Sequence, residues 1–202
     1  MKGWTNHAER TAIIERETEH YAAGLSLRDC DEGPRFGRYY LRGNWTWVEV
    51  VTLRHGLYVG GDIETVVFSG HPSAEKYGVR SPLYWMATRS YSYAAEKAGL
   101  GNTESEEWDA ACARACVLEY QKDDVFTAAE AQALLGVLDH DEGEHAFRQA
   151  VYETLEDSEY CSMGDVVSRR VIRATAVLRR LTRLLEQRDF QGASAGWFRR
   201  AA

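Results

Sequence analysis

The chain has 202 residues, which is enough to bury a sizeable core in one large domain or two small ones. Hydrophobic residues make up 45% and charged residues 27%, as in ordinary globular proteins. No apolar run approaches the roughly 18 residues that a membrane span requires. The N-terminal segment MKGWTNHAERTAIIERETEH lacks the apolar core of a signal peptide, so we expect a cytoplasmic protein.

The net charge of −7 is distributed unevenly along the chain. Residues 1–100 carry 12 acidic and 12 basic residues, residues 101–165 carry 17 acidic and 3 basic, and residues 166–202 carry 2 acidic and 9 basic. An acidic block followed by a basic tail indicates either that the two segments neutralise each other within the fold or that they face charged partners.

The N-terminal half predicts one helix followed by strands. Residues 4–22 have a weak helical stripe, and 28–37 contain a Gly-Pro pair typical of a loop. The period then changes to two, with aromatic and β-branched residues alternating with polar ones. We expect an antiparallel meander of three or four strands, drawn from residues 36–43, 44–54, 56–61 and 63–70.

From residue 73 onward the pattern is helical. Ser81-Pro82 opens a helix over 83–98, and the capping-box pairs Thr103/Glu106 and Thr127/Glu130 open two more. Further helices are predicted over 144–158 and 165–189. The fold class is therefore α+β: an N-terminal helix, a meander and about five C-terminal helices. We expect residues 1–75 and 76–202 to pack as one unit.

The last predicted helix carries an apolar seam with alternating spacings of four and three. Such a heptad pattern predicts packing against another helix, in the same chain or in a second copy, and the first arrangement is the more common. The seam consists of Val167, Val171, Ala174, Leu178, Leu181 and Leu185.

Two clusters contain residue types that bind metals. The segment DHDEGEH includes Asp139, His140, Asp141 and His145, but it also lies between two predicted helices, where polar residues collect. Cys112 and Cys116 share a helical face, yet a zinc site needs two more ligands. The four cysteines, which are Cys30, Cys112, Cys116 and Cys161, form no CxxC pair, and we expect free thiols and no cofactor.

The segment LYVGGDIETVVFSG raises the question of a site. Gly60-Gly61-Asp62 lacks the ending of a phosphate loop and is better explained as turn geometry that needs a positive φ. Asp62 and Glu64 lie two residues apart on one face of a predicted strand. They would act as a carboxylate pair if the chain were a metal-dependent enzyme. The basic tail offers a DNA-binding interpretation through Arg169, Arg173 and Arg180.

Three segments of the chain are LYVGGDIETVVFSG, SPLYWMATRSYSYAAEKAG and ESEEWDAACARACVLEY. Together they resemble a group of tailed-phage and prophage proteins with a GD-x-x-T-x-V-F-S hairpin. The resemblance covers about residues 36–120 and departs from the group's usual Gly-Thr-Tyr-Val run at Glu64–Val67. It implies a phage-encoded accessory protein in the bacterial cytoplasm, and by analogy an anti-CRISPR-like inhibitor.

The sequence hypothesis is therefore a non-enzymatic inhibitor that binds a host defence complex through an acidic surface, which would occupy a nucleic-acid groove of that complex. The alternatives are a metal-dependent enzyme acting on nucleic acid or nucleotide, and a DNA-binding regulator. The expected contact residues are Glu104, Glu106, Glu107, Asp109, Asp123 and Asp124.

Overall fold

The computed structural model describes residues 7–53, 56–69, 75–100, 106–140, 143–155 and 163–200. The chain divides into two compact units. We call residues 1–14 and 106–166 the helical unit, and residues 15–105 and 167–202 the sheet unit. The expected boundary at residue 75 therefore lies inside the sheet unit.

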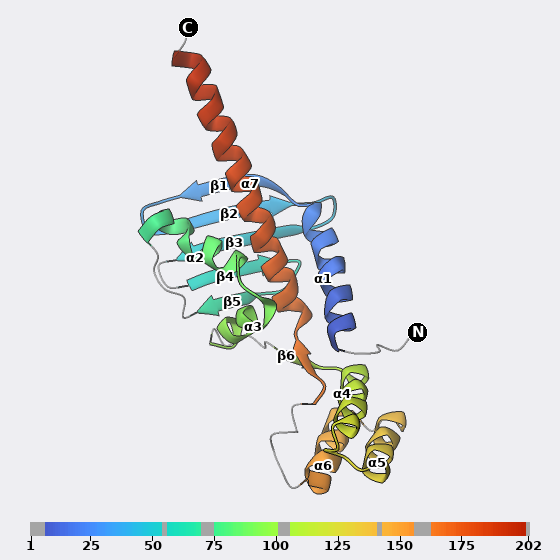
Figure 1. Ribbon diagram of the computed structural model, residues 1–202. Helices are drawn as coiled ribbons and strands as arrows, with labels where there is room; N and C mark the ends of the chain where they lie inside the picture. The colour runs from blue at the N-terminus through green and yellow to red at the C-terminus, as the bar shows by residue number, and fades with distance from the viewer. Residues whose placement is uncertain are drawn as a thin grey trace. The chain divides into compact units, whose positions relative to one another are not determined.

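The sheet unit is built on a five-stranded antiparallel meander whose strands follow one another in chain order (Figure 1). The predicted fold class is confirmed, and the meander has five strands where three or four were expected. The strands are β1 (Ser26–Glu32), β2 (Phe36–Arg42), β3 (Trp47–Leu53), β4 (Gly56–Gly61) and β5 (Val66–Ser69).

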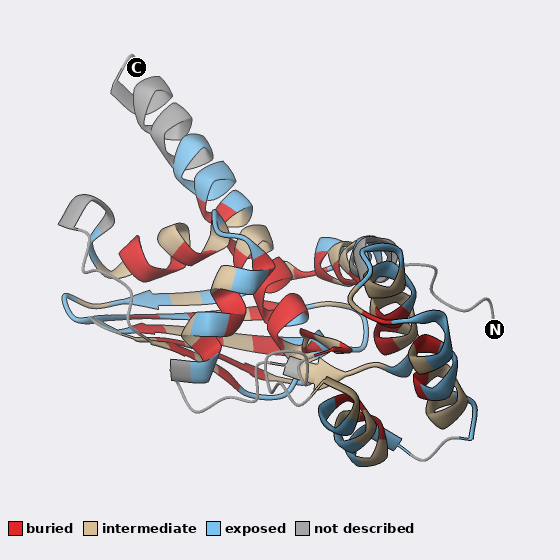
Figure 2. Ribbon diagram, turned by 60° about the horizontal axis from the view of Figure 1, so that its bottom comes forward, coloured by how far each residue is buried: buried red, intermediate tan, exposed pale blue. Residues whose placement is uncertain are grey.

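One face of the sheet is buried because hydrophobic residues alternate along the central strands. The helices of this unit, α2 (Ser81–Ala87), α3 (Tyr91–Leu100) and α7 (Arg169–Arg200), lie on that face (Figure 2). A 3₁₀ segment, η1 (Glu75–Arg80), leads into α2, and α1 (His7–Ala23) precedes the sheet. The buried strand residues are Tyr39, Leu41, Val48, Val50, Thr52, Leu57, Val59, Val66 and Phe68.

The heptad seam of the C-terminal helix is buried within the same chain. Its residues from Val171 to Leu185 are at most 2% exposed and belong to the core formed with the sheet, α2 and α3. Val167 is half-buried and precedes the helix, in the strand β7 (Asp165–Val167). Each buried Val or Leu side chain contributes about 1.5–3 kcal/mol, so this seam anchors α7 to its own sheet.

Two predictions for this unit were wrong. Residues 28–32 form most of β1 rather than a loop, paired with β2 through a register shift between Leu27 and Asp29. The expected helix over 83–98 is two helices, because residues 88–90 leave the helical path between α2 and α3.

The Gly60-Gly61-Asp62 segment closes β4 as a turn. Gly61 has a φ of 113°, and a Cβ there would lie 2.5 Å from the carbonyl oxygen of Trp47. The Asp62 carboxylate accepts a hydrogen bond of 2.8 Å from the Trp47 amide, which ties the turn to β3. The predicted role of glycine in turn geometry is confirmed at Gly61. The φ of Gly60 is not positive.

The helical unit contains α4 (Ala110–Lys122), α5 (Ala128–Asp139) and α6 (Gly143–Leu155), with a short strand, β6 (Glu106–Trp108), paired with β7. The capping box at Thr127 and Glu130 is confirmed, with hydrogen bonds of 3.3 and 2.7 Å. This unit has its own core, formed by Ala113, Val117, Phe126, Ala131, Leu134, Phe147, Val151 and Met163.

The predicted starts of two helices were wrong. Glu106 lies in β6, and α4 begins after Asp109, whose carboxylate accepts a hydrogen bond of 2.7 Å from the Cys112 amide. Asp165 lies in β7, so the last helix begins only at Arg169. Among the helices that the structure describes, none is long and apolar enough to cross a membrane.

Candidate functional site

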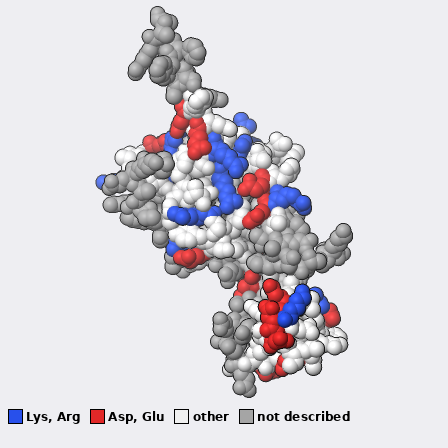
Figure 3. All heavy atoms as spheres, viewed as in Figure 1, with Lys and Arg blue, Asp and Glu red and all other residues white. Residues whose placement is uncertain are grey.

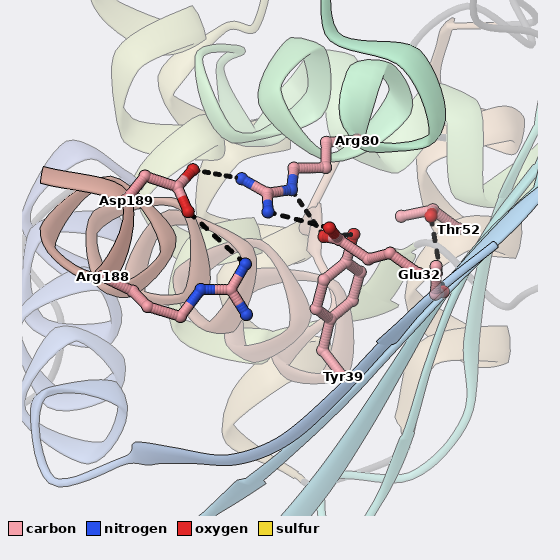
Figure 4. Close-up of polar contacts among 7 residues, drawn as sticks. Glu32, Tyr39, Thr52, Arg80, Arg188 and Asp189 are labelled. Atoms are coloured by element: carbon pink, nitrogen blue, oxygen red, sulfur yellow. Dashed lines mark hydrogen bonds and ion pairs between the residues drawn. The ribbon is translucent and has the colours of Figure 1, made fainter. Parts of the chain in front are cut away.

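Among the described residues of the sheet unit, a polar network is centred on Arg80, at the end of η1 (Figure 4). Its guanidinium donates to both carboxylate oxygens of Glu32 on β1, at 2.5 and 2.8 Å, and to Asp189 on α7 at 2.5 Å. The Tyr39 hydroxyl donates to Glu32 at 2.9 Å, and the side chain of Arg188 donates to Asp189 at 3.5 Å. Three elements distant in the chain are thereby joined by one guanidinium.

The electrostatics of this network are those of a structural junction. Hydrogen bonding to Arg80 lowers the pKa of the Glu32 and Asp189 carboxyl groups below their usual ranges. Burial, with help from the adjacent Glu32 carboxylate, raises the pKa of Tyr39. The carboxylates therefore stay ionised and paired at neutral pH, which suits holding α7 and η1 on the sheet.

A groove of about 420 Å³ lies beside this network, between α2 and α7. Arg179 enters it in a fixed position, since its guanidinium donates to the Tyr91 hydroxyl at 2.8 Å and to the Arg89 carbonyl at 3.0 Å. It also stacks over the Tyr91 ring, 4.4 Å from the ring centroid. The groove is lined by Glu19, Tyr84, Ala87, Thr88, Arg179, Thr182, Arg183 and Glu186.

Basic side chains mark this face of the sheet unit. Figure 3 shows a band of Lys and Arg along the middle of α7, with Asp and Glu beside it over α1 and toward its C-terminal end. Next to the groove, the exposed guanidinium of Arg89 lies 4.9 Å from the ring centroid of Trp85 and 5.6 Å from that of Tyr93.

The predicted DNA-contacting arginines divide into two groups. Arg169 and Arg173 are exposed on α7. Arg180 is half-buried and donates a hydrogen bond of 3.0 Å to the carbonyl of Leu25, so it helps fix the chain that follows α1. The structure therefore leaves two of the three at the surface and gives the third a structural role.

The six predicted acidic contact residues do not share one role. Glu104 and the side chain of Glu106 lie outside the described part, and Glu107 is half-buried in β6. Asp109 caps α4 and is thereby engaged in the fold. Asp123 and Asp124 are exposed together at the turn after α4.

The acidic end of α4, which we define as Glu119, Asp123 and Asp124, is the exposed acidic group that remains. The unit's other charges are largely paired: Arg114 with Asp139 at 2.5 Å, and Arg148 with Glu144 and Asp165 at 2.9 and 2.5 Å. Figure 3 shows Asp and Glu gathered over α4, with a smaller group of Lys and Arg beside them.

The predicted metal cluster is only partly described. Asp139 is paired with Arg114, and His140 caps the C-terminus of α5 through its backbone amide. His145 is exposed on the first turn of α6, while Asp141 lies outside the described residues. Within the residues described, no three His, Cys, Asp or Glu side chains are placed to hold a metal ion.

The two cysteines of α4 lie together inside the helical unit. Cys30, Cys112 and Cys116 are free thiols, as the sequence predicts, and Cys161 is outside the described residues. A hydrogen bond with Cys112 lowers the pKa of the Cys116 thiol to about 7, and the Gly164 backbone adds to this effect.

Comparison with known proteins identifies no relative: no family model, no curated protein and no solved structure matches this chain. The groove and the Arg80 network were both absent from the sequence predictions. Their residues come from distant positions, with Arg80 and Asp189 separated by 109 residues. Trp85, Arg89, Tyr91 and Tyr93 lie close together in the sequence, a local signal of this face that the sequence predictions did not use.

Proposed function

We propose that this protein is a phage- or prophage-encoded inhibitor that binds a basic surface of a bacterial defence complex through the acidic end of α4. The observation that carries the proposal is the accumulation of Glu119, Asp123 and Asp124 in the last turn of α4 and the turn that follows. Lys122 is the only basic residue beside them in the sequence.

This placement is unfavourable for the isolated fold. The C-terminus of a helix carries partial negative charge, so acidic side chains there cost about 0.3–1 kcal/mol each at an exposed position. Asp124 adopts a φ of 58°, the left-handed conformation that ends many helices, and the Val125 amide donates to the Tyr120 carbonyl at 2.9 Å. The local cost here is therefore electrostatic, and a cost of this kind is typical of a functional surface.

A hydrophobic residue accompanies the acidic group. The side chain of Leu118 is 43% exposed and borders the acidic side of α4, one residue before Glu119 and one turn before Lys122. Protein interfaces combine such an apolar anchor with a charged rim, and complementary charge raises the association rate. A basic groove that normally accepts nucleic acid has the matching charge, which is why we propose a nucleic-acid-binding defence complex as the partner.

The test uses variants that remove charge and keep shape. E119Q/D123N/D124N removes the acidic end of α4, and asparagine tolerates the left-handed backbone at position 124. D31N/E15Q/E96Q makes the same change in net charge on the sheet unit. Phage plating efficiency is measured in bacteria that each carry one defence system and express one variant.

We expect the wild-type protein and the sheet-unit variant to restore plating on at least one strain. With the α4 variant, the plating efficiency on such a strain should be at least tenfold lower than with the wild-type protein, since several charge-assisted contacts are removed together. Equal restoration by both variants would reject the acidic end of α4 as the binding surface. Restoration on none of the strains would reject the inhibitor function itself.

A further inference from the structure

The groove between α2 and α7 has a defined direction. Helix α2 runs antiparallel to α7. Arg80, just before α2, contacts Asp189 of α7, whereas the carbonyl of Arg89, just after α2, contacts Arg179, which lies ten residues earlier in α7. One end of the groove is therefore formed around Arg179, and the other is lined by Tyr84 and Glu186. Arg183 is one helical turn beyond Arg179, between the two ends.

The cationic end of the groove is preorganised. The Arg179 guanidinium donates to the Tyr91 hydroxyl and to the Arg89 carbonyl, and it also lies over the Tyr91 ring. The Arg89 side chain is itself held against the rings of Trp85 and Tyr93, which fixes the loop that supplies the carbonyl. A guanidinium fixed in this way loses little entropy when it binds an anion.

Arg183 supplies a second guanidinium. It is exposed, and it forms no hydrogen bond or ion pair with the residues that the structure describes. Two arginines one turn apart present paired donors to the oxygens of a phosphate group. Glu19 lies 3.6 Å from Arg179 and competes with such an anion for the same guanidinium.

The opposite end suits a flat group that carries hydrogen-bond donors. The Tyr84 ring provides apolar surface, and the Glu186 carboxylate accepts hydrogen bonds but donates none. A nucleobase can stack on a tyrosine ring, and its amino group or the ribose hydroxyls can donate to a carboxylate. The groove's volume, about 420 Å³, is within the range of small-molecule sites and exceeds what an inorganic phosphate would fill.

We propose that the groove between α2 and α7 binds a mononucleotide, with its phosphate on Arg179 and Arg183 and its base against Tyr84. This site is in the sheet unit and is independent of the function proposed for the acidic end of α4. A nucleotide bound here contacts both helices, so it links α2 to α7 in addition to the Arg80 network.

The experiment is a calorimetric titration of the full-length protein at low salt. The probes are AMP, GMP, CMP and UMP, with inorganic phosphate, ribose 5-phosphate and adenosine as comparisons. We expect at least one mononucleotide to bind about tenfold or more tightly than each comparison compound, because the phosphate and base ends act together. The proposal would be overturned if ribose 5-phosphate bound as tightly as every mononucleotide. It would also be overturned if no mononucleotide bound at concentrations up to about 10 mM.

Matched variants locate the site. Arg183→Gln should weaken mononucleotide binding about tenfold, since a charge-assisted contact is lost. Arg173→Gln makes the same charge change on α7 outside the groove and should leave binding unchanged. Glu19→Gln should tighten binding, because the competing carboxylate is removed. Equal weakening by Arg183→Gln and Arg173→Gln would show a diffuse charge effect and reject the site.

Discussion

At the scale of single residues, Gly61 is the position where the backbone most clearly dictates the side chain. Its φ of 113° disfavours any side chain, and a Cβ would lie only 2.5 Å from the Trp47 carbonyl oxygen. Gly61→Ala should therefore destabilise the sheet unit by about 1–3 kcal/mol. Urea denaturation followed by circular dichroism measures this loss.

Gly56, on the same strand, is the matched control. A Cβ there would meet nothing within 4 Å, and its φ is not positive. Gly56→Ala should be neutral or stabilise the unit by up to about 1 kcal/mol, because alanine has less entropy to lose on folding. A loss of stability equal to that of Gly61→Ala would show that side-chain bulk on β4, rather than backbone conformation, is responsible.

The two adjacent glycines also show how far single-residue prediction reaches. A Gly-Gly-Asp turn signal correctly predicted the positive φ at Gly61. At Gly60 a Cβ would instead meet the ring of Tyr58 on the same strand, so a larger residue there requires that ring to move. Such a contact depends on the side-chain rotamer in the folded sheet, so turn propensities contain no information about it.

At the scale of secondary-structure elements, alternation predicted the central strands and missed the edge. Strands β2 and β3 bury every second residue, which produces the alternating pattern. Strand β1 has no fully buried residue, so SLRDCDE carries no hydrophobic alternation and resembles a polar loop. The capping-box pattern at Thr103 and Glu106 misled for a different reason, since Asp109 is an equally good N-cap.

The junction of η1, β1 and α7 could not be predicted from local sequence, because Arg80 is 48 residues from Glu32 and 109 from Asp189. Arg80→Met should destabilise the sheet unit by about 2 kcal/mol, since it leaves a partly buried carboxylate without its donors. Arg38→Met removes a single pair, between the exposed Arg38 side chain and the half-buried Glu49, and should cost less, about 1 kcal/mol or below. Urea denaturation of the two variants measures both effects, and equal losses would contradict the structural role of Arg80.

The pH dependence of stability provides a second readout of the same junction. The pKa values of Glu32 and Asp189 are lowered in the folded protein, so their contribution is fully present above the unfolded values of about 4. It is lost as the pH falls through the lower folded values. The difference in unfolding free energy between wild type and Arg80→Met should therefore shrink from about pH 6 to about pH 3. A constant difference over this range would contradict the assigned pairing.

At the scale of the whole molecule, the residues that the structure describes form two hydrophobic cores that share no residue. The core of the helical unit is formed by α4, α5 and α6, and that of the sheet unit by the meander with α2, α3 and α7. Because each unit buries its own apolar surface, we expect each to open and exchange its amide protons as a separate cooperative unit.

Two variants test this separation. Thr127→Ala removes the hydroxyl that caps α5 and should cost the helical unit about 1 kcal/mol, while Arg80→Met acts in the sheet unit. Hydrogen exchange followed by mass spectrometry reports on peptides from α5 and α6 and from β2 to β4. Thr127→Ala should accelerate exchange about fivefold in the first set only, and Arg80→Met in the second set only. Acceleration of exchange in both sets of peptides by either variant would mean that the two cores unfold together. A charge change made in one unit would then also change the stability of the other.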